Sequence, residues 1–152
     1  MIHQKDIPRL VFSLSLLIQS NNKRVSYYRT AAERAQDPDL KALMLACAEQ
    51  SQNYSNDLIR WIKAYGASPA PQKKSVATVA WERLKDILMM NDESLPVTSG
   101  AIENDTLKVY KTALGLSFLP GTAIKDIRKH ISDFEKARDT FMVLDRKGLV
   151  AA

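Results

Sequence analysis

Cysteine, histidine and glycine are all scarce in this chain, and each shortage excludes a class of protein. A single cysteine, Cys47, rules out an intrachain disulfide and favours a reducing compartment, which we take to be the cytoplasm. It falls on an apolar helix face, so we expect a small buried side chain and no catalytic thiol. Neither a Gly-rich phosphate-binding loop, a Cys-x-x-Cys pair nor a nucleophile elbow occurs. No recognisable catalytic constellation remains, and the sequence predicts no enzyme.

Long hydrophobic runs and dense charge clusters are absent too. The apolar run at 10–18 is too short to cross a membrane, and no small-residue cleavage site follows it. We therefore expect it to begin a structural helix. The net charge is +5, but the basic residues are scattered, which is typical of a solvated surface. The composition predicts neither a membrane span nor a nucleic-acid partner, and it identifies no small-molecule substrate.

Helical periodicity is the main signal in the first half of the chain. Apolar residues recur at alternating spacings of three and four over 7–36, which predicts a bundle helix capped by Asp6. Asp37 is then a suitable N-cap for a second helix with Pro38 in its first turn, and Gly66 is a suitable end. The first stripe consists of Ile7, Val11, Leu14, Ile18, Asn21, Val25, Tyr28, Ala32 and Ala35.

The second half repeats this plan after a long connection. We predict a crossover over 67–96 that contains a short helix over 76–89, then helices over 97–116 and 122–147, the last ending at Gly148. No stretch alternates with a period of two, so no sheet is expected. The prediction is one all-α domain over 1–152, an antiparallel four-helix bundle built from helix pairs at 7–66 and 97–147.

An internal echo supports a duplicated helix pair. Residues 21–31 (NNKRVSYYRTA) match residues 103–113 (ENDTLKVYKTA) at an offset of 82, with four identities. Tyr28 corresponds to Tyr110, and Asn21 to Glu103. The same offset pairs Gly66 with Gly148.

The chain resembles a ferritin-like bacterial family that is classed as a domain of unknown function. The residues that carry the resemblance are 28–33 (YRTAAE), 37–43 (DPDLKAL) and 107–114 (LKVYKTAL). The resemblance extends from about residue 8 to residue 147. It implies a ferritin-like bundle with a crossover helix, and no assigned biochemical activity.

Ferritin-like di-iron proteins use a Glu from each of two helices and Glu-x-x-His from each of the other two. Neither Glu-x-x-His motif is present, and Asn21 replaces the carboxylate that corresponds to Glu103. A partial site for iron, manganese or zinc is the alternative, with Glu49, Glu103, His130 and Asp133 as candidates. Against it, these residues would lie on helix flanks, facing solvent or forming pairs such as Asp126–His130 and His130–Asp133.

Four polar residues are predicted to lie in the core. Asn21 and Gln50 fall on apolar stripes, where they form either a buried amide pair that sets helix register or a vestigial ligand position. Tyr28 and Tyr110 are expected to bond across the core through their hydroxyls.

The apolar character of the first helix extends beyond one stripe. Phe12 and Leu16 lie away from the main seam, so they pack either under the crossover helix or at a homodimer interface. The function expected is therefore a non-catalytic bundle that acts by structural association or self-assembly.

Overall fold

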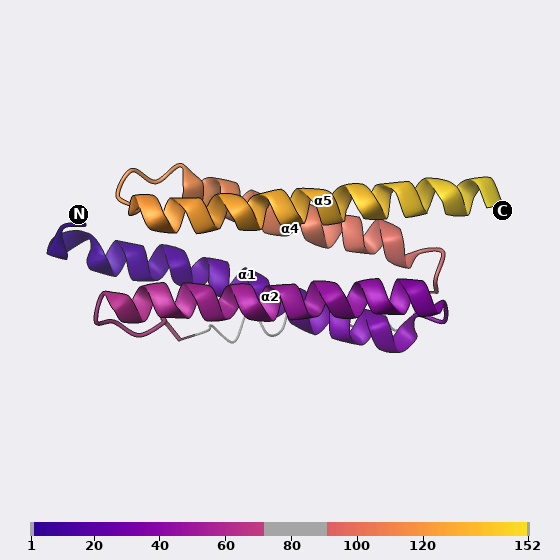
Figure 1. Ribbon diagram of the computed structural model, residues 1–152, viewed down its shortest axis with the longest axis horizontal. Coiled ribbons are helices and arrows are strands. Elements are labelled where there is room, and N and C mark those ends of the chain that lie inside the picture. The colour runs from indigo at the N-terminus through magenta and orange to yellow at the C-terminus, as the bar shows by residue number, and fades with distance from the viewer. Residues whose placement is uncertain (1, 72–90, 152) are drawn as a thin grey trace.

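The computed structural model describes residues 2–71 and 91–151, with side chains to residue 147, and this part of the chain contains helices and no strand (Figure 1). A short 3-10 turn (Gln4–Asp6) precedes four long helices, α1 (Ile7–Arg34), α2 (Pro38–Ala64), α4 (Leu95–Leu114) and α5 (Gly121–Ala151). The all-α helical bundle is confirmed. The helix predicted over 76–89 lies outside the described residues. Within the described helices, none has the length and apolar character needed to cross a membrane.

The helices form two layers, α1 with α2 and α4 with α5 (Figure 1). The contacts between the layers show the relative directions of the helices, because residue numbers rise along one helix as they fall along its partner. On α1 and α4, Asn21 meets Tyr110 and Arg24 meets Glu103. On α2 and α5, Tyr54 meets Asp133, and Trp61, further along α2, meets an earlier residue of α5. Each neighbouring pair is therefore antiparallel while α2 and α4 run in parallel, which is why a long connection must join them.

Two of the predicted helix boundaries are confirmed by their local geometry. Asp37 caps α2, because its carboxylate accepts a hydrogen bond from the Leu40 backbone N–H at 2.8 Å, and Pro38 occupies the first turn. Gly66 follows α2 with a φ of 73°, a left-handed conformation that favours glycine.

Other boundaries differ from the prediction. Asp6 makes no side-chain cap and pairs with Arg9 instead, at 3.6 Å. Helix α4 begins at Leu95, two residues earlier than expected, because Pro96 is accommodated in a first turn where its missing N–H costs nothing. Helix α5 continues past Gly148 to Ala151, so this glycine does not end the helix as predicted. A helix-interior glycine lowers helix propensity but does not by itself terminate a helix.

The α1–α2 turn is held by a contact that the sequence did not suggest. The carboxylate of Asp92, just before α4, accepts the backbone N–H groups of Gln36 and Asp37 at 2.8 and 2.9 Å. These two donors precede α2 and have no partner within a helix. The end of the crossover is thereby tied to the turn between the first two helices.

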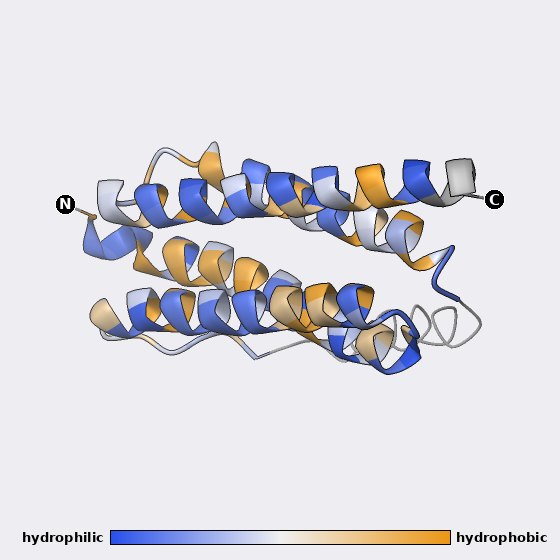
Figure 2. Ribbon diagram, turned by 45° about the vertical axis from the view of Figure 1, so that its right-hand side comes forward, coloured by the Kyte–Doolittle hydropathy of each residue, from blue (hydrophilic) through white to orange (hydrophobic). Residues whose placement is uncertain are grey.

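The core has two apolar parts with a polar layer between them, and Figure 2 shows polar colour on the outer helix faces. One part contains Leu14, Leu58, Ile127 and Phe134, and the other contains residues around Phe141. The buried polar residues between them are Asn21, Arg24, Ser51, Glu103 and Thr106, and Ser55 and His130 are buried among the residues of the first part. Buried polar groups of this number need partners from neighbouring helices.

Candidate functional site

Two reciprocal hydrogen bonds link α1 to α4 inside this polar layer. Asn21 Nδ2 on α1 donates to the Tyr110 hydroxyl on α4 at 2.7 Å. In the second bond α1 supplies the tyrosine instead: the Tyr28 hydroxyl on α1 donates to Glu103 Oε1 on α4 at 2.7 Å. The 82-residue offset exchanges these two bonds, because it relates Asn21 to Glu103 and Tyr28 to Tyr110. The internal repeat is thus a pseudo-two-fold relation between the contacts of α1 and α4.

A fully buried ion pair lies beside the second of these bonds. Arg24 Nε lies 3.1 and 3.0 Å from the two carboxylate oxygens of Glu103, and Nη2 lies 2.6 Å from Oε1. The third guanidinium nitrogen, Nη1, donates to α2. Its acceptors are the Cys47 carbonyl at 3.1 Å, Gln50 Oε1 at 3.0 Å and Ser51 Oγ at 2.8 Å. One side chain therefore joins three helices through charge-assisted hydrogen bonds.

Arg24, Glu103 and Tyr28, with Cys47, Gln50 and Ser51 of α2, form one buried polar cluster. Burial and the charge of Glu103 determine the pKa values of its side chains. Burial lowers the pKa of Arg24, but the Glu103 carboxylate more than offsets this and leaves the pKa raised, so the guanidinium is charged. Burial and the same carboxylate raise the pKa of Tyr28 well above 10, which keeps its hydroxyl protonated as a donor. The guanidinium also lies 4.7 Å from the Phe134 ring centroid, within cation–π range.

A directed hydrogen-bond chain leads from the core to α5. Asn21 Nδ2 also donates to the Leu17 carbonyl at 2.9 Å, and since a carbonyl only accepts, this fixes the amide orientation. The Tyr110 hydroxyl also lies 2.9 Å from His130 Nδ1. We assign the hydrogen of the neutral ring to Nε2 because that atom faces the Asp57 carboxylate at 3.7 Å, which makes Nδ1 the acceptor of the Tyr110 proton.

Three polar pairs join α2 to α5 at successive helical turns. The pairs are Tyr54–Asp133, Asp57–His130 and Trp61–Asp126. The Trp61 indole donates to Asp126 at 2.8 Å, and Tyr54 stacks on the His130 ring with centroids 3.6 Å apart. A cavity of about 330 Å³ brings solvent to this seam, lined by Asp57, Arg60, Trp61, Ala64 and Asp126.

Burial determines the protonation of His130, which is 1% exposed. Desolvation lowers its pKa to about 4, against the opposing influence of Asp57 and Asp126. The imidazole is therefore neutral at neutral pH, in agreement with its role as the acceptor for Tyr110.

The structure separates the four candidate metal ligands. Glu49 is exposed, whereas Glu103 and His130 are buried and Asp133 is half-buried. Glu103 binds Arg24, His130 binds Tyr110, and Asp133 accepts from Tyr54. Within the described residues, no three His, Cys, Asp or Glu side chains are placed to hold a metal ion. The expected solvent-facing position is correct for Glu49 and wrong for Glu103 and His130.

The predicted core polar residues are not paired as the sequence suggested. Asn21 and Gln50 do not form an amide pair, because Asn21 bonds Tyr110 while the half-buried Gln50 accepts from Arg24. Tyr28 and Tyr110 do cross the core, but to Glu103 and to Asn21 with His130. Over the described residues, these buried side chains satisfy their polar atoms except at Asn21 Oδ1.

Sequence reasoning missed Arg24, Ser51 and Asp57. Arg24 was counted only among the scattered basic residues that are typical of a solvated surface. A usable signal was its position three residues after Asn21 and four before Tyr28, which places it on the same buried face. Nothing local marks Ser51 or Asp57, because their partners are 27 residues earlier and on α5, respectively.

The side chains of the cluster are occupied by one another. The Cys47 thiol is no nucleophile at neutral pH, because burial raises its pKa to about 11. Arg24, Glu103 and Tyr28 bind one another and are fully buried, so a substrate has no access to them.

Comparisons with family models, with curated proteins and with solved structures give no match for this chain.

Proposed function

We propose that this protein is a non-catalytic, ferritin-like bundle of the cytoplasm that acts through structural association. One observation carries the first part of the proposal. In a ferritin-like di-iron bundle, inward carboxylates bind metal. Here the inward carboxylate of Glu103 is bound through both oxygens by the Arg24 guanidinium. A fixed internal cation therefore neutralises the charge that a metal ion would need.

The helix arrangement supports the ferritin-like assignment. Two antiparallel pairs, joined by one long connection between the parallel helices α2 and α4, have the connectivity of ferritin-like folds. The motifs at 28–33, 37–43 and 107–114 support membership of the bacterial family of unknown function. The alternative is a metal-binding member that uses Glu103, His130 and Asp133.

Metal analysis separates these alternatives. We expect protein purified without chelator to contain only substoichiometric iron, manganese and zinc, and we expect none of these ions to raise its Tm. The physical reason is that binding at Glu103 would leave the buried Arg24 charge without its counterion. Stoichiometric metal that Glu103→Gln loses and the exposed-site control Glu93→Gln retains would establish the alternative instead.

Self-association is proposed to involve the outer face of α1. Phe12 is 59% exposed and Leu16, one helical turn later, is 40% exposed. Neighbouring large apolar side chains on a helix surface are a feature of protein interfaces. We therefore propose that this face of α1 forms a homodimer interface.

Light scattering after size exclusion tests the dimer. We expect twice the 17.1 kDa chain mass for the wild type and the single chain mass for Phe12→Ser/Leu16→Gln. Leu45→Gln is the matched control, because Leu45 is 50% exposed but lies on α2. A wild type that stays monomeric at high concentration would contradict the proposal.

A further inference from the structure

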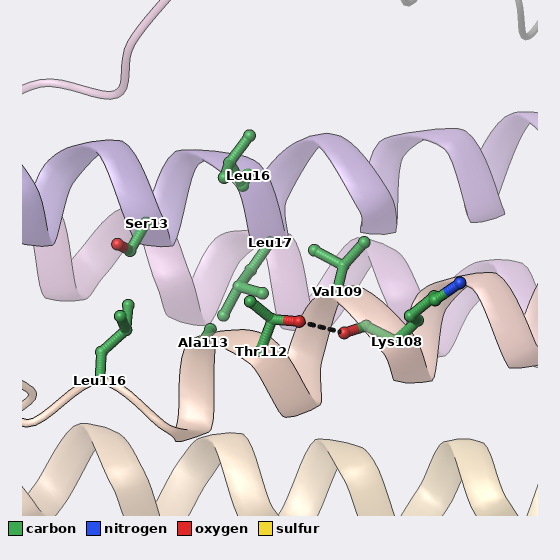
Figure 3. Close-up of a pocket in the computed structure, with 8 residues that line it drawn as sticks. All are labelled: Ser13, Leu16, Leu17, Lys108, Val109, Thr112, Ala113 and Leu116. Carbon is green, nitrogen blue, oxygen red and sulfur yellow. Dashed lines mark hydrogen bonds between the residues drawn. The ribbon is translucent and has the colours of Figure 1, made fainter.

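An apolar groove opens between α1 and α4 on the side of the bundle away from the polar pairs of α2 and α5. Its volume is about 380 Å³, which lies in the range of small-molecule sites. Leu17 and Ala113 are fully or almost fully buried beneath it, and Val109 and Leu116 are half-buried along it (Figure 3). The residues that line the groove are Ser13, Leu16, Leu17, Lys108, Val109, Thr112, Ala113 and Leu116.

The groove has a charged side chain, Lys108, at one end, which is its polar end, and at the other end Ser13 lies on the same side as Leu116 (Figure 3). Lys108 and Leu116 lie at opposite ends of it in Figure 3. Beyond Val109, a smaller cavity of about 50 Å³ continues along the same two helices, and its lining is mostly polar. The lining residues of this second cavity are Ser20, Lys23, Arg24, Ile102, Asp105, Thr106 and Val109. Lys108 is thus the charged residue of the groove lining, and it lies next to the polar second cavity.

Lys108 supplies a positive charge at the polar end. Its side chain is exposed, and within the described part of the chain its ammonium takes part in no ion pair or hydrogen bond. The Thr112 hydroxyl is committed to the Lys108 backbone carbonyl at 2.9 Å, so the ammonium is the charged group presented at this rim. An anionic head group complements it.

We propose that this groove binds a single-chain carboxylate amphiphile, that is, a medium-chain fatty acid. The hydrocarbon chain lies against the accessible side chains of Leu16, Val109 and Leu116, and the carboxylate faces Lys108. The α4 part of the lining, from residue 108 to residue 113, extends about 7.5 Å at 1.5 Å per residue, and Leu116 continues the lining beyond the end of α4. This length suits a chain of medium length. Apolar contact provides most of the affinity, and the exposed lysine selects the anionic head group.

Displacement of a fluorescent probe, dansylaminoundecanoic acid, tests the proposal on the full-length protein. We expect laurate to displace the probe below its aggregation concentration, and decanoate to bind up to about 15-fold more weakly because two buried methylenes are lost. Lys108→Glu should weaken laurate binding about fivefold and leave binding of the uncharged methyl ester unchanged. Thr112→Phe should abolish both, because the ring fills the groove.

Lys111→Glu is the matched control, since Lys111 is exposed on α4 and makes the same charge change outside the groove. Circular dichroism verifies that each variant is folded. The proposal is overturned if laurate does not displace the probe, if chain length has no effect, or if Lys108→Glu and Lys111→Glu behave alike. Binding to phosphatidylcholine–phosphatidylglycerol vesicles without displacement by monomeric laurate also overturns it, in favour of a membrane surface. Leu16 lines the groove and also belongs to the proposed dimer face, so the two proposals are tested by different measurements. Probe displacement tests the groove, and the molecular mass tests the dimer.

Discussion

Replacing Glu103 with alanine is expected to lower the free energy of unfolding by about 3–5 kcal/mol, the range for a buried ion pair that loses one partner. Arg24 and Glu103 are both 0% exposed, so the variant leaves a guanidinium in the core without its counterion. The Tyr28 hydroxyl loses its acceptor in the same step. Urea unfolding at pH 7 measures the change. The exposed Glu49→Ala should lie within about 0.5 kcal/mol of the wild type.

Removing the whole cluster should be far less costly than removing one partner. In Arg24→Met/Glu103→Leu/Tyr28→Phe, the charges and the donating hydroxyl leave together, so the penalty for an unpaired buried charge is absent. Only the neutral acceptors on α2, among them Gln50 and Ser51, lose a donor. We expect this variant to be as stable as the wild type or more stable, by up to about 4 kcal/mol. If Glu103→Ala does not fold, a folded triple variant still shows that the unpaired buried charge causes the instability. If the triple variant is as unstable as Glu103→Ala, this expectation is wrong. The Arg24–Glu103 ion pair would then contribute a net free energy to folding, beyond offsetting the cost of burying its two charges.

Acidification is expected to destabilise the protein through His130 by about 2 kcal/mol between pH 7.5 and pH 5. Above pH 6.5 the imidazole is neutral in both the folded and the unfolded state, so it contributes no pH dependence. Below that value the unfolded state binds the proton, whereas the buried ring, with a pKa lowered to about 4, does not. Stability therefore falls as the pH falls, and the loss is complete below about pH 4, where both states are protonated.

Urea unfolding at a series of pH values measures this slope. His130→Gln should flatten it over the range from pH 7.5 to pH 5, whatever its effect on stability at neutral pH. His3→Gln is the matched control, because His3 is exposed near the N-terminus and contacts none of the cluster residues. An unchanged slope in His130→Gln would contradict the assignment of this acid sensitivity to His130.

Helix content and helix order could be predicted from sequence because both depend on local rules. The alternating spacing of apolar residues identifies the buried face of α1, and Asp37 with Pro38 identifies the start of α2. The errors arose where one residue type has two local uses. Pro96 was interpreted as a break but lies in a first turn, and Gly148 was interpreted as an end but lies inside α5.

The repeat marked the right positions without revealing their partners. Correspondence of Asn21 with Glu103 and of Tyr28 with Tyr110 was visible in the sequence. That each tyrosine bonds the polar residue of the other repeat depends on the antiparallel packing of α1 and α4. Arg24 lay outside this pattern, because its counterpart at the same offset is Thr106.

The sequence by itself determined four long helices, their antiparallel pairing and the apolar stripes that they bury, since these follow from spacing and capping over a few residues. Only the tertiary structure decided which polar groups meet. Arg24 and Glu103 are 79 residues apart, and their contact depends on helix rotation and register that no local pattern encodes. The same packing turned Glu103 from a candidate metal ligand into the partner of a buried cation. It also formed the apolar groove between α1 and α4 beside Lys108, with the buried Leu17 and Ala113 beneath it.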